Sequence, residues 1–242
     1  MTLHSIDKKK KILFYIILFL LFSTQITKGK NEKNYSTVKL NNIIVTGLSD
    51  DNNYEVYQSL KFLLKKNIFF VDKSNFSNIL KENELVENYN VKKIYPNLIK
   101  VIIKQADLLA VTNYKGKKFY IGSNGKLIPF GKIKNFINNL PFVYSKNHYM
   151  DFIKLKKIID ESDFQFQQIE SFYYFPSNRW DIKTRDGLLI KLPETNLAES
   201  LKLAQLIKSN KKIMKKNIID LRIKNKVILS DEWKKIWYIF WI

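Results

Sequence analysis

The sequence predicts an α+β protein with an N-terminal transmembrane helix, a small β-α-α-β-β domain, and a C-terminal, mainly antiparallel β domain with flanking helices. Three observations support this fold class. An apolar run follows a lysine cluster near the N terminus. Apolar residues then recur first at helical and later at alternating spacing. In the second half of the chain, short apolar segments are separated by turn signals such as Asn-Gly and Asp-Gly.

The N-terminal segment is predicted to be an uncleaved anchor over residues 12–27. Its purely apolar part, Ile12–Phe22, has eleven residues, a length that is also typical of a cleaved signal peptide. Residues 23–27 extend it to roughly 24 Å of helix, near the lower limit for a bilayer span. We favour the anchor because no small-x-small cleavage site follows the apolar run.

The lysines at positions 8–11 set the expected orientation of this anchor. By the positive-inside rule, residues 1–11 are cytoplasmic, and the chain after about Asn34 is extracytoplasmic. The protein is therefore expected to be a single-pass type II membrane protein.

The composition excludes several classes of function. The formal net charge is +20, but only three of the 42 basic residues are Arg (Arg179, Arg185 and Arg222). Because Arg dominates bidentate phosphate and base contacts, we expect no nucleic-acid partner. The absence of Cys excludes thiol catalysis, Cys-ligated zinc and disulfides. Acidic residues and Gly are dispersed, so we expect no enzyme activity, no cofactor, no metal and no small-molecule substrate.

The first folded domain is predicted over residues 38–114. Asp50 and Asp51 supply helix caps, and Val101 and Ile103 alternate with Ile102 and Lys104 as in a half-buried strand. The expected elements are a strand over 38–47, a helix over 54–64, an extended link over 67–72, a helix beginning near Asp72 or Ser74, and strands over 85–94 and 98–105.

The second domain is predicted over residues 115–242. Asn124-Gly125 is the strongest hairpin signal in the chain. The expected elements are a hairpin that joins 109–114 to 118–121, a strand over 126–130, a helix over 149–163, strands over 168–174, 179–184 and 188–192, a helix over 196–208, and strands over 217–222 and 226–229.

Several motifs in this order resemble the FtsQ/DivIB family of bacterial cell-division proteins. Asn42-Ile-Ile-Val-Thr-Gly47, Phe69-Phe-Val-Asp72 and the strand pair around Pro96 are similar to a POTRA domain of the FtsQ type. Residues 178–193 and Ile219-Asp-Leu-Arg222 are similar to the C-terminal β domain of that family. The chain departs from the family at Gln105–Ala110, where a Glu-Arg-x-Pro-x-Ala element is usual.

The resemblance implies a non-enzymatic divisome scaffold in the inner membrane at the division septum. Its implied partners are FtsB and FtsL foremost, with FtsK, FtsW and FtsI as further candidates. In the family, the strand after the Val-Asp-Leu-Arg motif is the docking edge for FtsB and FtsL. Carried over by position, the docking residues are Arg222, Ile223, Asn225, Val227, Leu229 and Trp233. The lysines nearby, Lys224 and Lys226, would meet acidic residues of a partner.

Three alternatives stay open at this point. The last strands could simply close the sheet rather than bind a partner strand. The aromatic tail from Trp233 to Ile242 could pack on its own sheet, pair with a partner, or lie in the membrane interface. The chain could also be another membrane-anchored POTRA protein that acts in envelope protein assembly or transport.

Overall fold

The computed structural model describes residues 8–24, 39–134, 137–210 and 216–231. The first helix, α1 (Lys8–Thr24), carries the apolar run, whose side chains are exposed from Ile12 to Phe22. In these ranges, no helix is long and apolar enough to cross a membrane. The predicted anchor runs to residue 27, so its last three residues lie outside the described ones.

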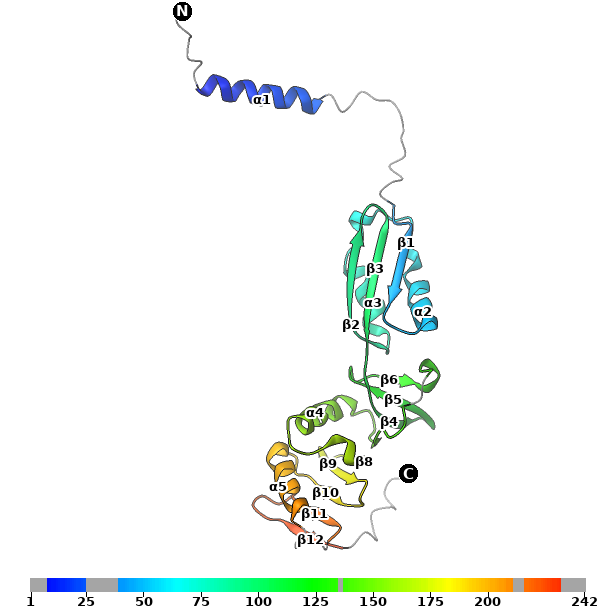
Figure 1. The fold of residues 1–242 in the computed structure, drawn as a ribbon, viewed down its shortest axis with the longest axis vertical. Helices are drawn as coiled ribbons and strands as arrows, with labels where there is room; N and C mark the ends of the chain where they lie inside the picture. Colours follow the sequence, from blue (N-terminus) through cyan, green and yellow to red (C-terminus); the bar gives the residue numbers. More distant parts are fainter. Residues whose placement is uncertain (1–7, 25–38, 135–136, 211–215, 232–242) are drawn as a thin grey trace, which may run out of the picture.

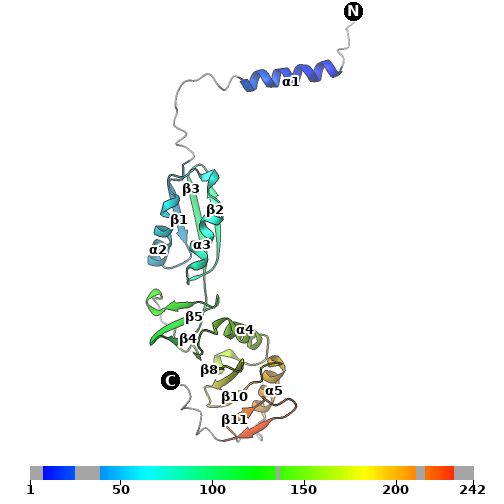
Figure 2. The same ribbon diagram turned by 180° about the vertical axis from the view of Figure 1, so that it is seen from behind.

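The first folded unit has the β-α-α-β-β order that the sequence predicts. Its elements are β1 (Asn42–Thr46), α2 (Asp50–Leu60), α3 (Ser74–Glu82), β2 (Val86–Ile94) and β3 (Leu98–Gln105). The sheet order is β1-β3-β2, with β1 parallel and β2 antiparallel to β3. The two helices cover one face of this sheet (Figures 1 and 2). Alternate residues of β3, such as Ile99 and Val101, are buried against them.

The first helix of this unit begins earlier than predicted. It starts at Asp50 rather than Tyr54, because Asp50 and Asp51 occupy its first turn, where they face the positive end of the helix dipole. It ends at Leu60 and continues as a 3₁₀ turn, η2 (Lys61–Leu63). The predicted extended link contains a second 3₁₀ turn, η3 (Ile68–Phe70).

The remaining strands form one nine-stranded sheet with two helices. Its elements are β4 (Leu108–Tyr114), β5 (Lys117–Gly122), β6 (Leu127–Pro129), η4 (Phe130–Lys132), β7 (Phe142–Tyr144), α4 (Tyr149–Asp160), η5 (Phe166–Gln168), β8 (Ile169–Phe175), β9 (Arg179–Thr184), β10 (Leu189–Lys191), α5 (Leu197–Ser209), β11 (Ile218–Asp220) and β12 (Ile228–Ser230). The strand order is β12-β11-β10-β9-β8-β7-β4-β5-β6.

This sheet is more mixed than predicted. Three neighbouring pairs are parallel, namely β4–β7, β7–β8 and β10–β11, while the other five are antiparallel. Two of these parallel pairs arise because a helix makes the connection: α4 links β7 to β8, and α5 links β10 to β11. A helical crossover returns the chain to the same end of the sheet, so the next strand runs parallel. The predicted helices were therefore crossover connections.

The chain passes from the first sheet to the second before the predicted domain boundary. The sequence places residues 109–114 in the first domain, whereas β4 lies in the nine-stranded sheet and pairs with β5. The chain leaves the first sheet after Gln105 and enters the second at Leu108. The boundary after residue 114 would divide a hairpin whose partners are hydrogen-bonded to each other.

Helices α4 and α5 bury the main core against one face of the large sheet. Phe152 of α4 contacts Phe172 of β8 edge to face, with ring centroids 5.1 Å apart. Leu201 and Ala204 of α5 are also fully buried in this cluster. The inward residues of both helices recur at three- and four-residue spacing, as expected of helices that pack on a sheet.

A small apolar joint connects the two sheets. Leu85 and Ala106 from the first unit pack with Tyr120 and Ile128 from the second, and all four are buried. The Tyr120 ring stacks on Phe130, with centroids 4.1 Å apart and planes 10° from parallel. Because Tyr120 and Ile121 alternate along β5, one face of this strand serves the joint and the other serves the main core.

Polar contacts surround this joint. The Asn124 side-chain amide donates to the carbonyl oxygens of Glu84 and Val86, each at 3.0 Å. Lys126 Nζ donates to the carbonyl oxygen of Asn83 at 3.1 Å, just beyond α3. On the α2 side, Asn52 Nδ2 donates to the Lys132 carbonyl oxygen at 2.9 Å. The Asn-Gly turn predicted as a hairpin signal therefore also holds the two units together.

The close approach of β1 to β3 requires glycine at position 47. Gly47 has φ +112°, and a Cβ atom there would lie 1.8 Å from the carbonyl oxygen of Ile103. We expect Gly47→Ala to lower the free energy of unfolding by at least about 2 kcal/mol, because backbone strain adds to a backbone clash. Gly116→Ala is the matched control: its φ is +76°, nothing lies within 4 Å of the added Cβ, and the expected loss is about 1 kcal/mol. Urea denaturation followed by circular dichroism measures both free energies of unfolding. Equal losses would contradict a steric requirement for glycine at position 47.

Candidate partner-docking edge

Strand β12 lies at one edge of the nine-stranded sheet (Figure 1). It pairs with β11 in antiparallel register, with Ile218 opposite Ser230, Ile219 opposite Leu229 and Asp220 opposite Ile228. Within the described part of the chain, no strand pairs with its other side. An unpaired edge of this kind can accept a strand from another protein.

The hydrogen bonds of β11 determine which backbone groups of β12 face outward. The Asn217 carbonyl oxygen accepts from Leu189 N–H at 2.8 Å, and Leu221 N–H donates to the Lys191 carbonyl oxygen at 2.9 Å. Odd-numbered residues of β11 therefore face β10. Backbone groups alternate along a strand, so Ile218 and Asp220 face β12. Their partners, Ser230 and Ile228, face β11 in return.

Leu229 is consequently the β12 residue whose backbone N–H and C=O point away from the sheet. Its side chain, in contrast, lies on the face of Ile219 and packs against the main core. A partner strand would thus bind backbone groups that the core holds in place.

The six predicted docking residues occupy different positions around this edge. Leu229 lies in β12, and Arg222 is the second residue after the end of β11. Ile223 and Val227 are 51% and 40% exposed in the connection between the strands, where Asn225 has φ +61°. Trp233, with the rest of the aromatic tail, lies outside the described residues.

Arg222 already has an intramolecular partner. Its Nε donates to Asp220 Oδ1 at 2.8 Å and Oδ2 at 2.9 Å, and its Nη2 also contacts Oδ2. Burial opposes ionisation of Asp220, but the hydrogen bonds and charge of Arg222 outweigh it and hold the Asp220 pKa below its usual value. The hydrogen bond to Asp220 likewise raises the pKa of Arg222. The guanidinium therefore fixes the exit from β11, and its charge is largely balanced within the chain.

A row of paired residues runs across the sheet toward this edge. Strand register places each of them directly opposite the next on one face of the sheet, so that neighbours are in lateral contact. We call this the cross-sheet row: Tyr144, Tyr173, Asp181, Lys191, Asp220 and Ile228. At its inner end, the rings of Tyr144 and Tyr173 stack with centroids 4.8 Å apart and planes 1° from parallel.

Asp181 is the buried carboxylate of the cross-sheet row. Its residue is only 3% exposed, and its Oδ1 has no hydrogen-bond partner. Burial raises the pKa of Asp181 to about 6, although the positive charges of Arg179, Lys191 and Arg222 oppose the shift. Removing a carboxylate from water without hydrogen bonds costs free energy, so this residue weakens the fold when it is charged.

Sequence reasoning missed the cross-sheet row. An acidic residue between Trp180 and Ile182, in the middle of a predicted strand, was an available signal for Asp181. The spacing of Asp220 and Arg222 was another, because residues two apart lie on the same face of a strand. The hairpin of β9 and β10 places Asp181 opposite Lys191, whereas the register of Lys191 with Asp220 depends on the crossover through α5 and has no local signal.

The described residues contain no cluster of three or more His, Asp or Glu side chains placed to hold a metal ion. His148 stacks on Tyr174, with centroids 4.2 Å apart, and its Nδ1 lies 3.3 Å from Asp151 Oδ2 at the start of α4. These contacts give His148 a structural role at the helix terminus.

Two protein-family models match the chain. The FtsQ-type POTRA domain matches residues 38–105, and the C-terminal domain of cell division protein FtsQ/DivIB matches residues 110–222. Together they cover the two sheets as far as Arg222, so β12 lies just beyond the matched residues.

Curated relatives carry the same description. Cell division protein FtsQ of Rickettsia bellii is 24% identical over 199 residues, which cover 79% of this chain and 72% of that protein. Cell division protein FtsQ of Bradyrhizobium diazoefficiens is 20% identical over 219 residues, which cover 86% of this chain and 62% of that protein. The solved extracytoplasmic domain of DivIB from Geobacillus stearothermophilus aligns with 46% of this chain and 92% of that domain at 14% identity, with a TM-score of 0.33.

Asp181 and Asp220 are expected to affect stability with opposite dependence on pH. Because the folded pKa of Asp181 is raised to about 6, its penalty is absent below about pH 4 and complete above about pH 6. As the pH rises from about 4 to about 6, we expect the free energy of unfolding of Asp181→Asn to increase by about 3 kcal/mol relative to the wild type. Because the folded pKa of Asp220 is lowered, Asp220→Asn should lose stability at neutral pH and approach the wild type as the pH falls. Urea denaturation from about pH 2.5 to 7.5 measures both differences, because the contribution of Asp220 is lost only below about pH 4. Stability differences that change in parallel for the two variants would contradict the opposite pKa shifts of Asp181 and Asp220.

Proposed function

Because the chain belongs to the FtsQ/DivIB family of cell division proteins, which are non-enzymatic divisome components, we propose that it is a single-pass membrane scaffold that binds FtsB- and FtsL-type partners at β12. The observation that carries this proposal is the unpaired outer side of β12 in the described structure, with the backbone of Leu229 directed outward. Strand addition needs such a row of backbone groups.

Charge and exposure around β12 support an acidic, partly apolar partner strand. Lys224 and Lys226 are exposed in the connection that precedes β12, and the described residues provide no ion pair for either. Ile223, Val227 and Ile228 are exposed apolar residues in the same segment. Opposite charges across such an edge favour encounter and register, while apolar contacts supply most of the affinity.

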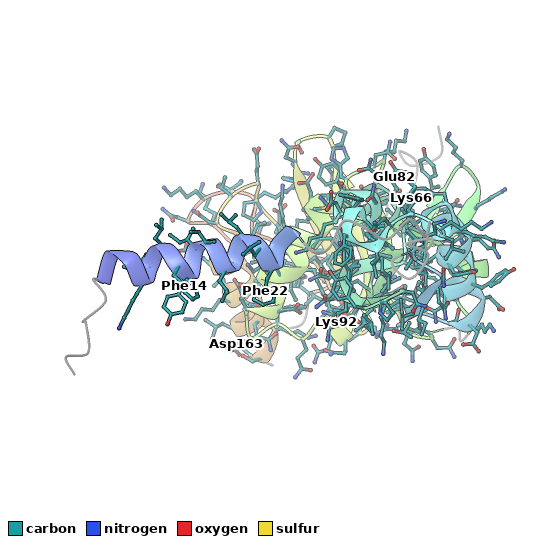
Figure 3. All side chains as sticks on the ribbon, turned by 90° about the horizontal axis from the view of Figure 1, so that it is seen from above. Phe14, Phe22, Lys66, Glu82, Lys92 and Asp163 are labelled. Carbon is teal, nitrogen blue, oxygen red and sulfur yellow. The ribbon has the colours of Figure 1, made fainter. Side chains whose placement is uncertain are left out.

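The proposed anchor explains how the scaffold would be held at the membrane. α1 presents an uninterrupted apolar surface from Ile12 to Phe22, and Phe14 and Phe22 project from it (Figure 3). The proposal extends this segment to residue 27, places residues 1–11 in the cytoplasm, and leaves both folded units outside it. The proposed units are a POTRA domain that recruits upstream or membrane partners, including FtsK, FtsW and FtsI, and a β domain that ends in the docking edge.

The location of the protein in dividing cells tests the division role. We expect an N-terminal fluorescent fusion of the full chain to form rings at midcell. A fusion truncated after Arg222 lacks β12 and should fail to retain FtsB and FtsL there. Fluorescence microscopy measures both. A uniform envelope signal from a functional fusion, unchanged through the division cycle, would reject the proposal and favour a POTRA protein of envelope assembly or transport.

Proline at position 229 tests strand addition directly. Leu229→Pro removes an N–H that faces outward, so the pairing of β11 with β12 is retained. We expect at least about a tenfold loss of affinity for the extracytoplasmic segments of FtsB and FtsL, because a backbone bond is lost and the ring obstructs the partner strand. Leu229→Ala keeps the N–H and is the matched control for the lost side chain. Titration calorimetry measures both, and equal affinities would rule out backbone pairing at this position.

A further inference from the structure

An exposed aromatic cluster lies at the end of the first unit that is remote from the large sheet. Its members come from η2, η3 and the turn between β2 and β3, and we call them the aromatic end: Phe62, Phe69, Phe70, Ile94 and Tyr95. All are at least 44% exposed, and Phe70 reaches 81%. Phe69 and Tyr95 stack with centroids 5.1 Å apart, so the separate segments form one surface.

The local fold forces these rings outward. In η3, Ile68 is fully buried, and the next buried residue is Val71, so Phe69 and Phe70 between them must face solvent. Asn67 fixes the start of this turn by accepting a hydrogen bond from Phe69 N–H at 3.0 Å. The Phe69 carbonyl oxygen accepts from Lys93 Nζ at 3.3 Å, which ties the turn to β2. The exposure is thus built into an ordered turn.

The charge around the aromatic end is mainly positive. The segments that form it, residues 39–41, 61–72 and 91–97, contain six Lys and one acidic residue, Asp72. Lys66 Nζ lies 4.9 Å from the centroid of the Phe62 ring. Figure 3 looks along the long axis from this side and labels Lys66 and Lys92 on opposite flanks of the unit. Aromatic rings interleaved with lysines are the combination found at membrane–water interfaces.

The chain enters the first unit at this same end. Lys39 pairs with Asn67, and Asn41 N–H donates to the Asn97 carbonyl oxygen at 2.9 Å. Only eleven residues separate position 39 from the proposed end of the anchor at residue 27. Fully extended, they span about 40 Å at most. The anchor therefore keeps the aromatic end close to the bilayer, whereas the joint with the large sheet lies at the opposite end of β1 and β3 (Figure 1).

We propose that the aromatic end docks on the bilayer that holds the anchor, with Phe69, Phe70 and Tyr95 at the level of the lipid headgroups and the lysines on anionic phospholipids. The inference rests on the proposed anchor and goes beyond it, because an anchor alone leaves the orientation of the folded units free. Anionic headgroups match the six lysines, and the rings supply the interfacial contact that lysines alone lack.

Site-specific fluorescence on the full chain tests this inference, since the absence of Cys allows single labels without background. Phe70→Cys, labelled with an environment-sensitive dye, reports on the aromatic end. Tyr54→Cys on α2, two residues from the Asn52 contact with the large sheet, is the remote control. Leu20→Cys in α1 reports insertion of the anchor. Each variant is reconstituted into phosphatidylcholine vesicles with and without one quarter phosphatidylglycerol, containing a spin-labelled lipid as quencher.

We expect at least twofold quenching at positions 20 and 70 in the anionic vesicles and none at position 54. Quenching at position 70, but not at position 20, should fall in high salt and in vesicles without phosphatidylglycerol. In the Phe70→Cys background, Lys66→Glu with Lys93→Glu should reduce it further, whereas Lys115→Glu in the turn between β4 and β5 should not.

The outcomes separate this inference from the anchor. Quenching at position 20 without quenching at position 70 overturns membrane docking and leaves the anchor in place. No quenching at position 20 rejects the anchor and the docking together. Equal quenching at positions 54 and 70 overturns docking by one end. A change at position 70 that requires added FtsB and FtsL would assign the aromatic end to a protein partner instead.

Discussion

The buried joint around Tyr120 is the contact on which the relative position of the two folded units depends. Without it, two separate sheets would be linked only by the short stretch between β3 and β4. With it, apolar packing is surrounded by hydrogen bonds from Asn124 and Lys126, and ion pairs such as Lys134 with Asp51 add contacts on the α2 side. The proposed scaffold role requires a fixed connection of this kind, because a scaffold acts through the distance and direction between its binding surfaces.

Charged side chains contribute to the packing near the β12 edge of the large sheet. Charges of the cross-sheet row alternate from Asp181 through Lys191 to Asp220, and Arg222 fixes the last carboxylate beside the exit from β11. Arg222 and Asp220 form an ion pair, whereas Lys191 acts on Asp181 and Asp220 through its charge. Partly buried charges contribute little net stability compared with apolar packing, but another strand register would separate them from the opposite charges. Asp181, whose Oδ1 has no hydrogen-bond partner, lowers the stability of the fold while it contributes to this specific strand register.

Local patterns predicted most elements of the fold, and tertiary pairing explains what they missed. β2 and β3 agree with prediction to within one residue, because alternation and the Tyr-Pro-Asn connection are local signals. β7 was missed because Phe142–Tyr144 is too short to show a period. The parallel pairs depend on crossover helices, which alone do not specify strand order. At the edge, the order of the last two strands predicts the terminal position of β12 in outline. The resemblance implies that Arg222 is available to a partner, whereas in the structure this side chain is bound to Asp220.

The order of strands in the large sheet also determines when the docking edge comes into existence. β12 pairs only with β11 in the described sheet, and β11 in turn pairs with β10. β10 and β11 are connected by the crossover helix α5, so their pairing requires that α5 has been synthesised. With the proposed anchor, export begins at the N terminus, and every other described strand of the sheet emerges before β12. The parallel β10–β11 pair spans α5 and requires loop closure, so it should form after the local hairpins, and β12 can join the sheet only once β11 is in place. A nascent chain would thus complete its core and its joint first and acquire the proposed docking edge last. Assembly at that edge would then be restricted to molecules whose synthesis and folding have reached β12.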